Sequence, residues 1–197
     1  MSAHENLEHA EHAEHASHGG NKKIALLISI IALFLAFSET LGKSAQTESI
    51  SLNIKASDTW NFFQAKTIRQ TMLRAQAESG TAQIAGITDP AAKDAMAKQV
   101  DAWKATVTRY ESDPKEKDGR KELREQAHAY EHERDTALAR YHHYEVASAA
   151  FQIGIVLASA EVITGMVILG WLSGGLGILG LIFMGIGLFA PHAVHLV

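Results

Sequence analysis

The side chain whose position most suggests chemistry is Glu161, a carboxylic acid in the most apolar part of the chain. From Val146 to Val197 it is the one ionisable residue other than histidine, and Val162 and Ile163 follow it directly. A carboxylate near the middle of a bilayer costs on the order of 3 kcal/mol even on lenient insertion scales, so such residues usually face protein or water. Three roles fit: a neutral, hydrogen-bonded acid that holds helices together, a group on a proton or ion pathway, or a contact to lipid or ligand. We favour the first.

A second carboxylate, Glu39, lies near the end of another apolar segment. With each segment centred in the bilayer and a rise of about 1.5 Å per residue, Glu39 and Glu161 differ in height by roughly 15 Å. Lys43 follows Glu39 by one helical turn, which is the spacing of a favourable ion pair. We therefore expect an interfacial ion pair between Glu39 and Lys43, and no carboxylate dyad.

Stripes of small residues predict which faces of the apolar segments pack, because helices in lipid associate by close backbone approach. One stripe shares a face with Glu161 and comprises Ala147, Ala150, Gly154, Ala158 and Gly165. A second comprises Ala25, Ser29, Ala32 and Ala36. Antiparallel pairing of the two in one register, Ala25 with Gly165 and Ala36 with Gly154, places Ser29 opposite Glu161. Thr164 is a second possible hydrogen-bond partner for that carboxyl group.

A third stripe of small residues indicates more packing surface than one copy of the chain uses. It comprises Ser173, Gly177, Gly180 and Gly187, interrupted by Met184. We therefore expect a homo-oligomer in the lipid bilayer.

The first residues of the chain carry histidines between glutamates. They are His4, His9, His12, His15 and His18. On a helix, His9, His12, His15 and His18 step by three and could chelate zinc, nickel or copper. A solvated tail without a cofactor is the simpler interpretation, with a charge that rises below pH about 6.5. A cluster of His142, His143, His192 and His195 near the membrane surface is a weaker metal hypothesis.

Composition excludes several function classes. The chain has no cysteine, so disulfides, cysteine-ligated zinc and thiol catalysis are excluded. A formal charge of −4, with basic residues interleaved among acidic ones, argues against nucleic-acid binding. The sequence contains no Gly-rich phosphate loop, nucleophile elbow or zinc-protease helix. We expect a protein that is not an enzyme.

The elements that must position these residues are helical. Three segments, 24–41, 146–169 and 172–190, are long and apolar enough to cross about 30 Å of hydrocarbon. The sequence thus predicts an all-α integral membrane protein with a tail at 1–23 and a short one at 191–197. All lysines and arginines precede Val146, which predicts that 42–145 lies on one side of the membrane; signals for which side conflict.

The middle region is expected to form three helices, at about 43–78, 90–112 and 119–145. Asp89 and Pro90 are a typical helix start, and the third helix should run on into the second span. Alternating steps of four and three indicate a coiled-coil seam in the last two helices. Its residues are Met96, Val100, Trp103, Val107 and Tyr110, then Leu123, Ala127, Tyr130, Arg134, Ala137 and Tyr141. The first helix has a broader, less regular packing face, and the helix lengths predict an oblique second helix or a break near Ser57 and Asp58.

The stretch from Lys55 to Gln70 reads KASDTWNFFQAKTIRQ, between a His/Glu-rich opening with one span and a charged helical region with two Gly-rich spans. In this combination nearly the whole chain resembles a bacterial membrane-protein family catalogued only as a domain of unknown function. The most specific residues are Asp58, Trp60, Phe62, Phe63, Gln64, Ala65 and Lys66. The resemblance implies a three-span, helix-rich fold in the bacterial inner membrane and implies no activity.

The leading functional hypothesis is a non-enzymatic, homo-oligomeric membrane scaffold that contacts a protein partner through its helical middle region. The alternative is a small ion or proton-conducting pore that uses Glu161. A scaffold requires that Glu161 face a neighbouring helix, whereas a pore requires a hydrated lumen. A third hypothesis is metal binding by the His-rich tail.

Overall fold

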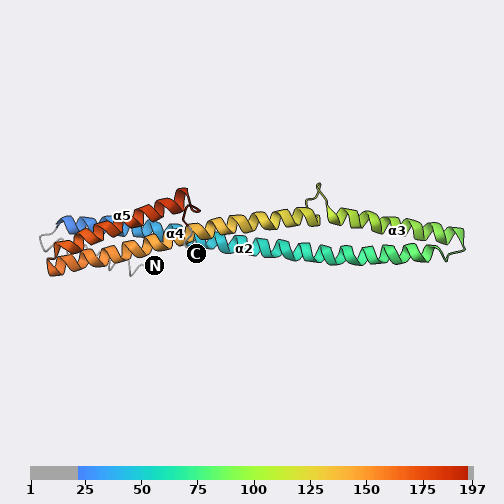
Figure 1. Ribbon diagram of the computed structural model, residues 1–197, viewed down its shortest axis with the longest axis horizontal. Helices are drawn as coiled ribbons and strands as arrows, with labels where there is room; N and C mark the ends of the chain where they lie inside the picture. Colours follow the sequence, from blue (N-terminus) through green and yellow to red (C-terminus); the bar gives the residue numbers. More distant parts are fainter. Residues whose placement is uncertain (1–21, 195–197) are drawn as a thin grey trace. The chain divides into compact units, whose positions relative to one another are not determined.

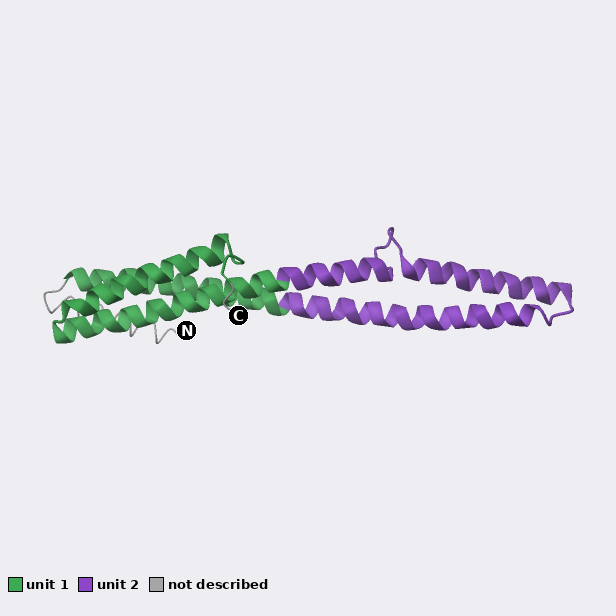
Figure 2. Cartoon of the chain, in the orientation of Figure 1, with its two compact units in different colours: residues 1–50, 134–197 green, residues 51–133 purple. Residues whose placement is uncertain are grey.

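The computed structural model describes residues 22–194, and these residues form four helices without any strand. The helices are α2 (Lys22–Ile84), α3 (Pro90–Glu111), α4 (Arg120–Thr164) and α5 (Val167–Phe189) (Figure 1). The chain divides into two compact units, unit 1 with residues 1–50 and 134–197 and unit 2 with residues 51–133 (Figure 2). The predicted all-α fold is confirmed for the described residues.

The packing face of α2 repeats every three or four residues along the entire helix. Its positions are buried or half-buried, namely Ile24, Ile28, Ile31, Leu35, Ser38, Gly42, Ala45, Ser49, Leu52, Ala56, Thr59, Phe63, Lys66, Gln70, Leu73, Ala77, Gly80 and Ile84. This alternation keeps one face of a helix against a neighbour. The prediction of a broad, irregular face was wrong, because small and polar residues occupy much of the stripe and conceal its period.

In unit 1, the first part of α2 packs with the end of α4 and with α5. The largest fully buried apolar side chains of its core are Ile28, Leu35, Phe151 and Ile155, each at most 2 % exposed. All four residues of the third predicted small stripe are buried within the chain. The expectation that this stripe is surplus packing surface was therefore wrong, because α2 and α4 of the same chain cover it. A Cβ added at Gly180 would approach the ring of Phe151 to 2.6 Å, so glycine there lets α5 lie close to α4.

The turn between α4 and α5 comes earlier than the hydropathy pattern predicts. α4 ends at Thr164 and α5 begins at Val167, whereas the predicted spans ended at 169 and resumed at 172. Gly165 has a φ of 70°, a left-handed conformation that interrupts the helix and suits glycine. The apolar composition continues through this turn, so hydropathy alone does not locate it.

In unit 2, α3 and the first part of α4 follow one another antiparallel to α2. Val100 and Trp103 of α3 lie around Gly80, and the Gln70 side chain donates a hydrogen bond to the Val107 carbonyl oxygen at 3.0 Å. The α3 helix therefore follows α2 along its length. Neither predicted alternative was right, since α3 is not oblique and α2 continues unbroken through Ser57 to Ile84 instead of ending near 78.

Other predictions for this unit agree with the structure. Asp89 caps α3 by accepting a hydrogen bond from the Ala92 backbone at 3.0 Å, and Pro90 is the first helical residue. The third predicted helix and the second span are one helix, α4. Every residue of the two predicted seams is buried or half-buried.

Three of these helices, α2, α4 and α5, contain stretches long and apolar enough to cross a membrane. Large apolar side chains point outward on all three, including Leu26, Val156, Ile163, Trp171 and Phe189. Outward-facing apolar side chains are what lipid tails require. The chain therefore has the character of a multi-pass membrane protein.

Candidate functional site

Glu161 lies in the last turn of α4 and packs against the beginning of α5. Its side chain is buried, and a Cβ added at Gly170 would overlap its carboxyl oxygens. Its Oε2 atom has no hydrogen-bond partner among the described residues. The amino-terminal turn of a helix carries partial positive charge, which favours a nearby carboxyl group. The prediction that Glu161 lies on a packed, small face is confirmed, and the face it meets belongs to a helix of the same chain.

Neither predicted partner bonds to Glu161. The Ser29 hydroxyl is exposed and donates to the Ala25 carbonyl oxygen at 2.9 Å, within its own helix. The Thr164 hydroxyl donates to the Ala160 carbonyl oxygen at 2.8 Å. Both predictions were wrong because hydroxyl groups in helices readily bond to the preceding turn.

The register predicted from the small residues was also wrong. Gly154 approaches Ile31, where the predicted register placed Ala36. The apolar stripe of α2 that contains Ile28 and Ile31 forms the core with α4 and α5. In the Ser29 stripe, Ala25 is buried and Ala32 packs at the edge of this core, whereas Ser29 is exposed. Glycines on α5 accept these larger side chains, so an interface of small residues on both helices is not needed.

Glu39 bonds across to α4. Its Oε1 accepts a hydrogen bond from the Gln152 side chain at 3.2 Å, and the exposed Lys43 forms no ion pair with it within the described residues. The predicted ion pair between Glu39 and Lys43 was wrong, because Gln152 supplies a donor to this carboxylate. Glu39 contacts Gln152, and Glu161 contacts Gly170, so the two carboxyl groups meet different parts of the helices, as expected for residues that form no dyad.

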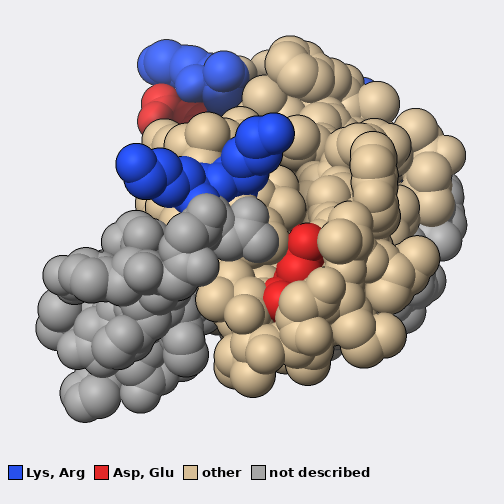
Figure 3. Space-filling view, turned by 90° about the vertical axis from the view of Figure 1, so that its left-hand side faces the viewer, with Lys and Arg blue, Asp and Glu red and all other residues tan. Residues whose placement is uncertain are grey.

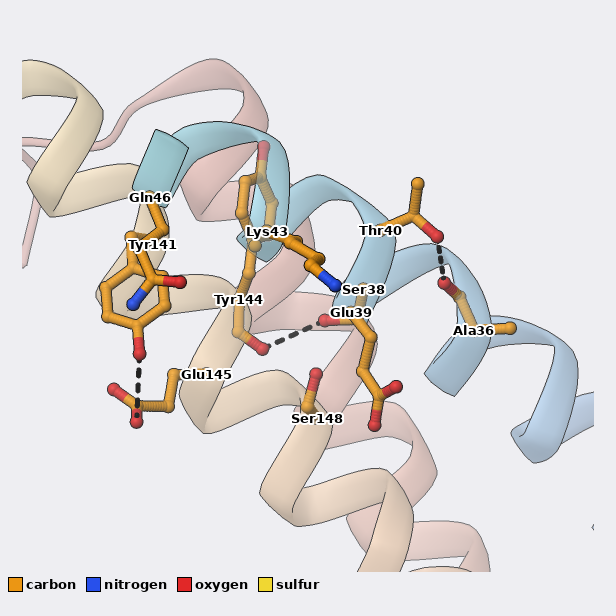
Figure 4. Close-up of a pocket in the computed structure, with 11 residues that line it drawn as sticks. Ala36, Ser38, Glu39, Thr40, Lys43, Gln46, Tyr141, Tyr144, Glu145 and Ser148 are labelled. Carbon is orange, nitrogen blue, oxygen red and sulfur yellow. Dashed lines mark hydrogen bonds between the residues drawn. The ribbon is translucent and has the colours of Figure 1, made fainter. Parts of the chain in front are cut away.

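A polar pocket of about 550 Å³ surrounds this region of unit 1 (Figure 4). It lies between α2 and α4, and its lining is Ala36, Ser38, Glu39, Thr40, Gly42, Lys43, Gln46, Tyr141, Tyr144, Glu145 and Ser148. The Ser38 hydroxyl donates to the Tyr144 carbonyl oxygen at 2.9 Å and ties the two helices together. The Tyr141 hydroxyl donates to Glu145 at 3.4 Å. Burial, and then the negative charge of Glu145, raise the pKa of Tyr141 above its usual value.

Sequence reasoning missed the α4 side of this pocket. Tyr141, Glu145, Ser148 and Gln152 recur at steps of four, three and four, which places them on one helical face. The signal in the sequence was this polar stripe, which continues into an apolar span. The prediction named only Glu39 and Lys43, which lie on the other helix of the pocket.

The described histidines do not converge on a metal. His143 is buried, its Nε2 lies 3.0 Å from the Pro191 carbonyl oxygen, and its ring stacks on Phe183. His142 faces Glu145 and His192 faces Thr136. Within residues 22–194 no group of three or more histidine or acidic side chains could hold a metal ion. His9, His12, His15, His18 and His195 lie outside the described residues, so metal binding by the tail stays a prediction.

The KASDTWNFFQAKTIRQ stretch supplies polar and aromatic contacts inside unit 2. Trp60 donates to Glu131 at 2.8 Å and contacts Phe63 edge to face. Lys66 pairs with Asp118 at 2.6 Å. These contacts join α2 to α4 and the segment before it, so Trp60, Phe63 and Lys66 have structural roles. Other residues of the stretch are exposed, among them Asp58, Gln64 and Phe62, which has 66 % of its surface exposed.

Arg120 organises a second polar group in unit 2. It donates to Thr67 at 2.9 Å, to Gln70 at 2.6 Å and to Glu111 at 2.8 Å. A hydrogen bond from Gln70 lowers the pKa of Glu111, and burial opposes this effect. The positive charge of Arg120 and its hydrogen bond add to the lowering, so the pKa of Glu111 lies below its usual value. The network joins α2, α3 and α4 where one helix ends and the next begins.

The face drawn in Figure 3 is mostly uncharged (Figure 3). Basic side chains gather in its upper left part together with an acidic area, and a second acidic area lies within the uncharged surface. Three candidate membrane-spanning helices and a helical unit 2 define the class: a multi-pass helical membrane protein.

Within that class, the chain belongs to the family described as Domain of unknown function (DUF4337), whose sequence profile matches residues 20–190. The resemblance drawn from the sequence to such a family is confirmed. Comparisons with curated proteins and with solved structures found no match.

Proposed function

We propose that this protein is a non-enzymatic scaffold of the bacterial inner membrane that associates with further copies of itself. The observation that carries the proposal is an apolar stripe on the outer side of α2 in unit 2. Ile54, Ile68 and Met72 are 55 %, 61 % and 59 % exposed there. Apolar side chains grouped on one exposed face outside a membrane span are a candidate contact surface for another protein.

The spacing of this stripe supports an ordered contact. Ile54 and Ile68 occupy equivalent positions two heptads apart, and Met72 lies one turn beyond Ile68. They lie opposite the seam formed by Phe63, Gln70 and other buried residues of α2. A second seam at heptad spacing fits another long helix in coiled-coil geometry.

Open glycines on α5 support association inside the membrane as well. A Cβ added at Gly174, Gly175 or Gly185 would meet nothing within 4 Å. Glycines at membrane helix surfaces allow the backbone of another helix to approach closely. The packing of Glu161 against Gly170 also supports a scaffold, because a carboxyl group that meets a helix does not line a lumen.

Disulfide crosslinking tests the proposal, since the sequence has no cysteine and an introduced thiol is the only one present. We expect I68C in the full chain, reconstituted in lipid nanodiscs, to form covalent dimers on mild oxidation. The matched control is D101C on α3, which is also exposed and outside the stripe. Equal crosslinking at both positions, or a monomeric wild type by native mass spectrometry, would contradict self-association.

The second candidate function is an ion or proton pore, favoured by the buried, unpartnered Oε2 atom of Glu161 in a candidate span. Proteoliposomes loaded with a pH-sensitive dye test it. The pore hypothesis expects proton flux that falls with Glu161→Gln. Flux that is unchanged in this variant removes the role of that residue.

A further inference from the structure

The polar pocket of unit 1 lies level with the end of the membrane-crossing helices. Gly187 of α5 approaches His143 and Tyr144, and α5 ends at Phe189. The apolar run of α2 ends at the same level, near Leu41. Tyrosine and charged side chains at this height correspond to the headgroup layer of a bilayer.

The lining of this pocket offers both signs of charge. Glu39 and Glu145 contribute carboxylates, and Lys43 contributes an ammonium group that no described acid neutralises. Gln46 and Ser148 add neutral hydrogen-bonding groups. A volume of about 550 Å³ is within the range of small-ligand sites. This set matches a ligand that carries a cation and an anion a few bonds apart.

We propose that this pocket binds the headgroup of a phospholipid that carries a primary ammonium group and a phosphate. Glu39 and Glu145 accept hydrogen bonds from the ammonium group, and Lys43 contacts the phosphate. Charge-assisted hydrogen bonds of this kind are stronger than neutral ones. A quaternary ammonium group has no N–H to donate, so the carboxylates favour the primary amine.

The surface next to the pocket suits an acyl chain. Ala36 lines the pocket, and Ala32 and Ser29 continue the same face of α2 into the span at helical spacing. Leu33 and Val156 are 55 % and 65 % exposed. These small residues and exposed apolar side chains offer an apolar surface to a chain attached to the headgroup. The ligand is therefore a membrane lipid and not a free phosphoamine.

Native mass spectrometry of the full chain in detergent tests the proposal by titration with lipids of identical acyl chains. Three headgroups are compared, namely phosphoethanolamine, phosphocholine and phosphoglycerol. We expect the phosphoethanolamine lipid to bind about tenfold more tightly than the others, a difference of about 1.4 kcal/mol. Water-soluble phosphoethanolamine without acyl chains is the fourth ligand and is expected to bind at least tenfold more weakly than its lipid.

Variants assign the preference to the pocket. The double variant Glu39→Gln, Glu145→Gln should abolish discrimination between the ethanolamine and choline lipids. Lys43→Gln should weaken both about equally, because it removes the phosphate contact. Matched controls with the same charge changes in unit 2 should bind lipids as the wild type does; they are the double variant Glu125→Gln, Glu133→Gln and the single variant Lys93→Gln.

Three results would overturn the proposal. Equal affinity for all lipids, or pocket variants that behave like their controls, would show that the pocket does not select the headgroup. Soluble phosphoethanolamine that binds as tightly as the lipid would show that no acyl chain takes part. Efficient crosslinking of Q46C between protomers would show that a second copy covers the pocket in place of lipid.

Discussion

At the scale of single residues, Glu161 combines a close packing contact with an oxygen atom that has no described hydrogen-bond partner. Its carboxyl group fills the space beside Gly170, and no described group bonds to its Oε2 atom. A buried polar atom without a partner costs free energy, so the local packing must be well adapted to retain it. The size of the side chain at position 170 should therefore affect stability as much as the chemistry of the Glu161 carboxyl group does.

We predict that Gly170→Ala destabilises the protein, because the added methyl group overlaps the Glu161 carboxyl oxygens. Overpacking of this kind costs about 1–3 kcal/mol. The companion variant Gly170→Ala, Glu161→Ala should recover most of that loss, since it empties the occupied space. Thermal unfolding in detergent, followed by circular dichroism, measures both.

The control for this experiment is Gly175→Ala on the same helix, where the added methyl group meets nothing within 4 Å. Its midpoint should equal or exceed that of the wild type, because alanine favours helices over glycine. A double variant no more stable than Gly170→Ala alone would show that Glu161 is not the obstacle.

A second residue-scale prediction concerns the pH dependence of unit 2. The folded pKa of Glu111 lies below its ordinary value of 4.5, so its ionised form stabilises the fold above about pH 4.5. That contribution is lost as the pH falls through the folded pKa. Because the side chain is 58 % exposed, Glu111→Gln should cost about 0.5 kcal/mol at pH 7.

The measurement is the difference in unfolding midpoint between wild type and Glu111→Gln from pH 7 to pH 3. The difference should shrink below about pH 4.5, where the wild type loses the same charge. Glu125→Gln, an exposed charge on α4, is the matched control. A difference that stays constant across this range would exclude a contribution from Glu111 ionisation.

At the scale of elements, α2 explains why small and polar residues recur inside the protein. Its packing face includes Ser38, Gly42, Ser49 and Gln70 as well as leucine and isoleucine. Ser38 and Gln70 each bond to a neighbouring helix, at Tyr144 and at Val107. Polar residues on this face therefore fix which segments of the chain lie beside α2.

The segment between α3 and α4 offers a prediction at this scale. Lys117 has a φ of 56°, the left-handed conformation that costs most residues other than glycine free energy. Lys117→Gly should raise the free energy of unfolding by up to about 1 kcal/mol. Glycine relieves the strained conformation, and this gain exceeds the cost of the greater freedom that glycine gives the unfolded chain. Lys115→Gly, in the same turn segment, should not raise it. Equal changes in the unfolding midpoint of the two variants would contradict a strained conformation at Lys117.

At the scale of the whole molecule, two units carry different surfaces. Unit 1 presents large apolar side chains such as Ile163 and Trp171, at 85 % and 77 % exposure, as a lipid environment requires. The large apolar side chains exposed on unit 2 are Phe62 and the α2 stripe of Ile54, Ile68 and Met72. Self-association through that stripe would leave the lipid-facing surface of unit 1 available to the bilayer.

We predict that Ile54→Lys, Ile68→Lys weakens self-association at least tenfold, because charged groups replace the apolar contact and repel their symmetry mates. The control Ala102→Lys, Ala105→Lys adds the same charge to exposed positions on α3. Mass photometry in nanodiscs reports the oligomer population, and circular dichroism should show unchanged helix content. An equal effect of both pairs would assign the change to net charge and not to the stripe.

The sequence predicted periodic, local features of the structure better than it predicted contacts between helices. The end of α3, its Asp89 cap, the continuity of α4 and the buried stripe from Ala147 to Glu161 follow from local spacing and composition, and they agree with the structure. The partner of Glu161 did not follow, because both Ser29 and Gly170 lie beside small residues and only the packed arrangement selects one. The Gln152 contact to Glu39 was also missed, because it joins two helices that are far apart in the sequence.

By itself, the sequence determined that the described chain is helical and that three stretches are apolar enough to span a membrane, because both properties arise from residues close together in the chain. It also determined that Glu161 is buried, since helical spacing places it among small residues. Only the tertiary structure decided that Glu161 meets Gly170, that the isoleucine face of α2 packs inward, and that Glu39, Lys43 and Tyr141 line one pocket. These outcomes depend on how side chains of distant segments pack together. A glycine stripe indicates that a helix face packs, but it does not indicate which side chain of another helix will contact each glycine.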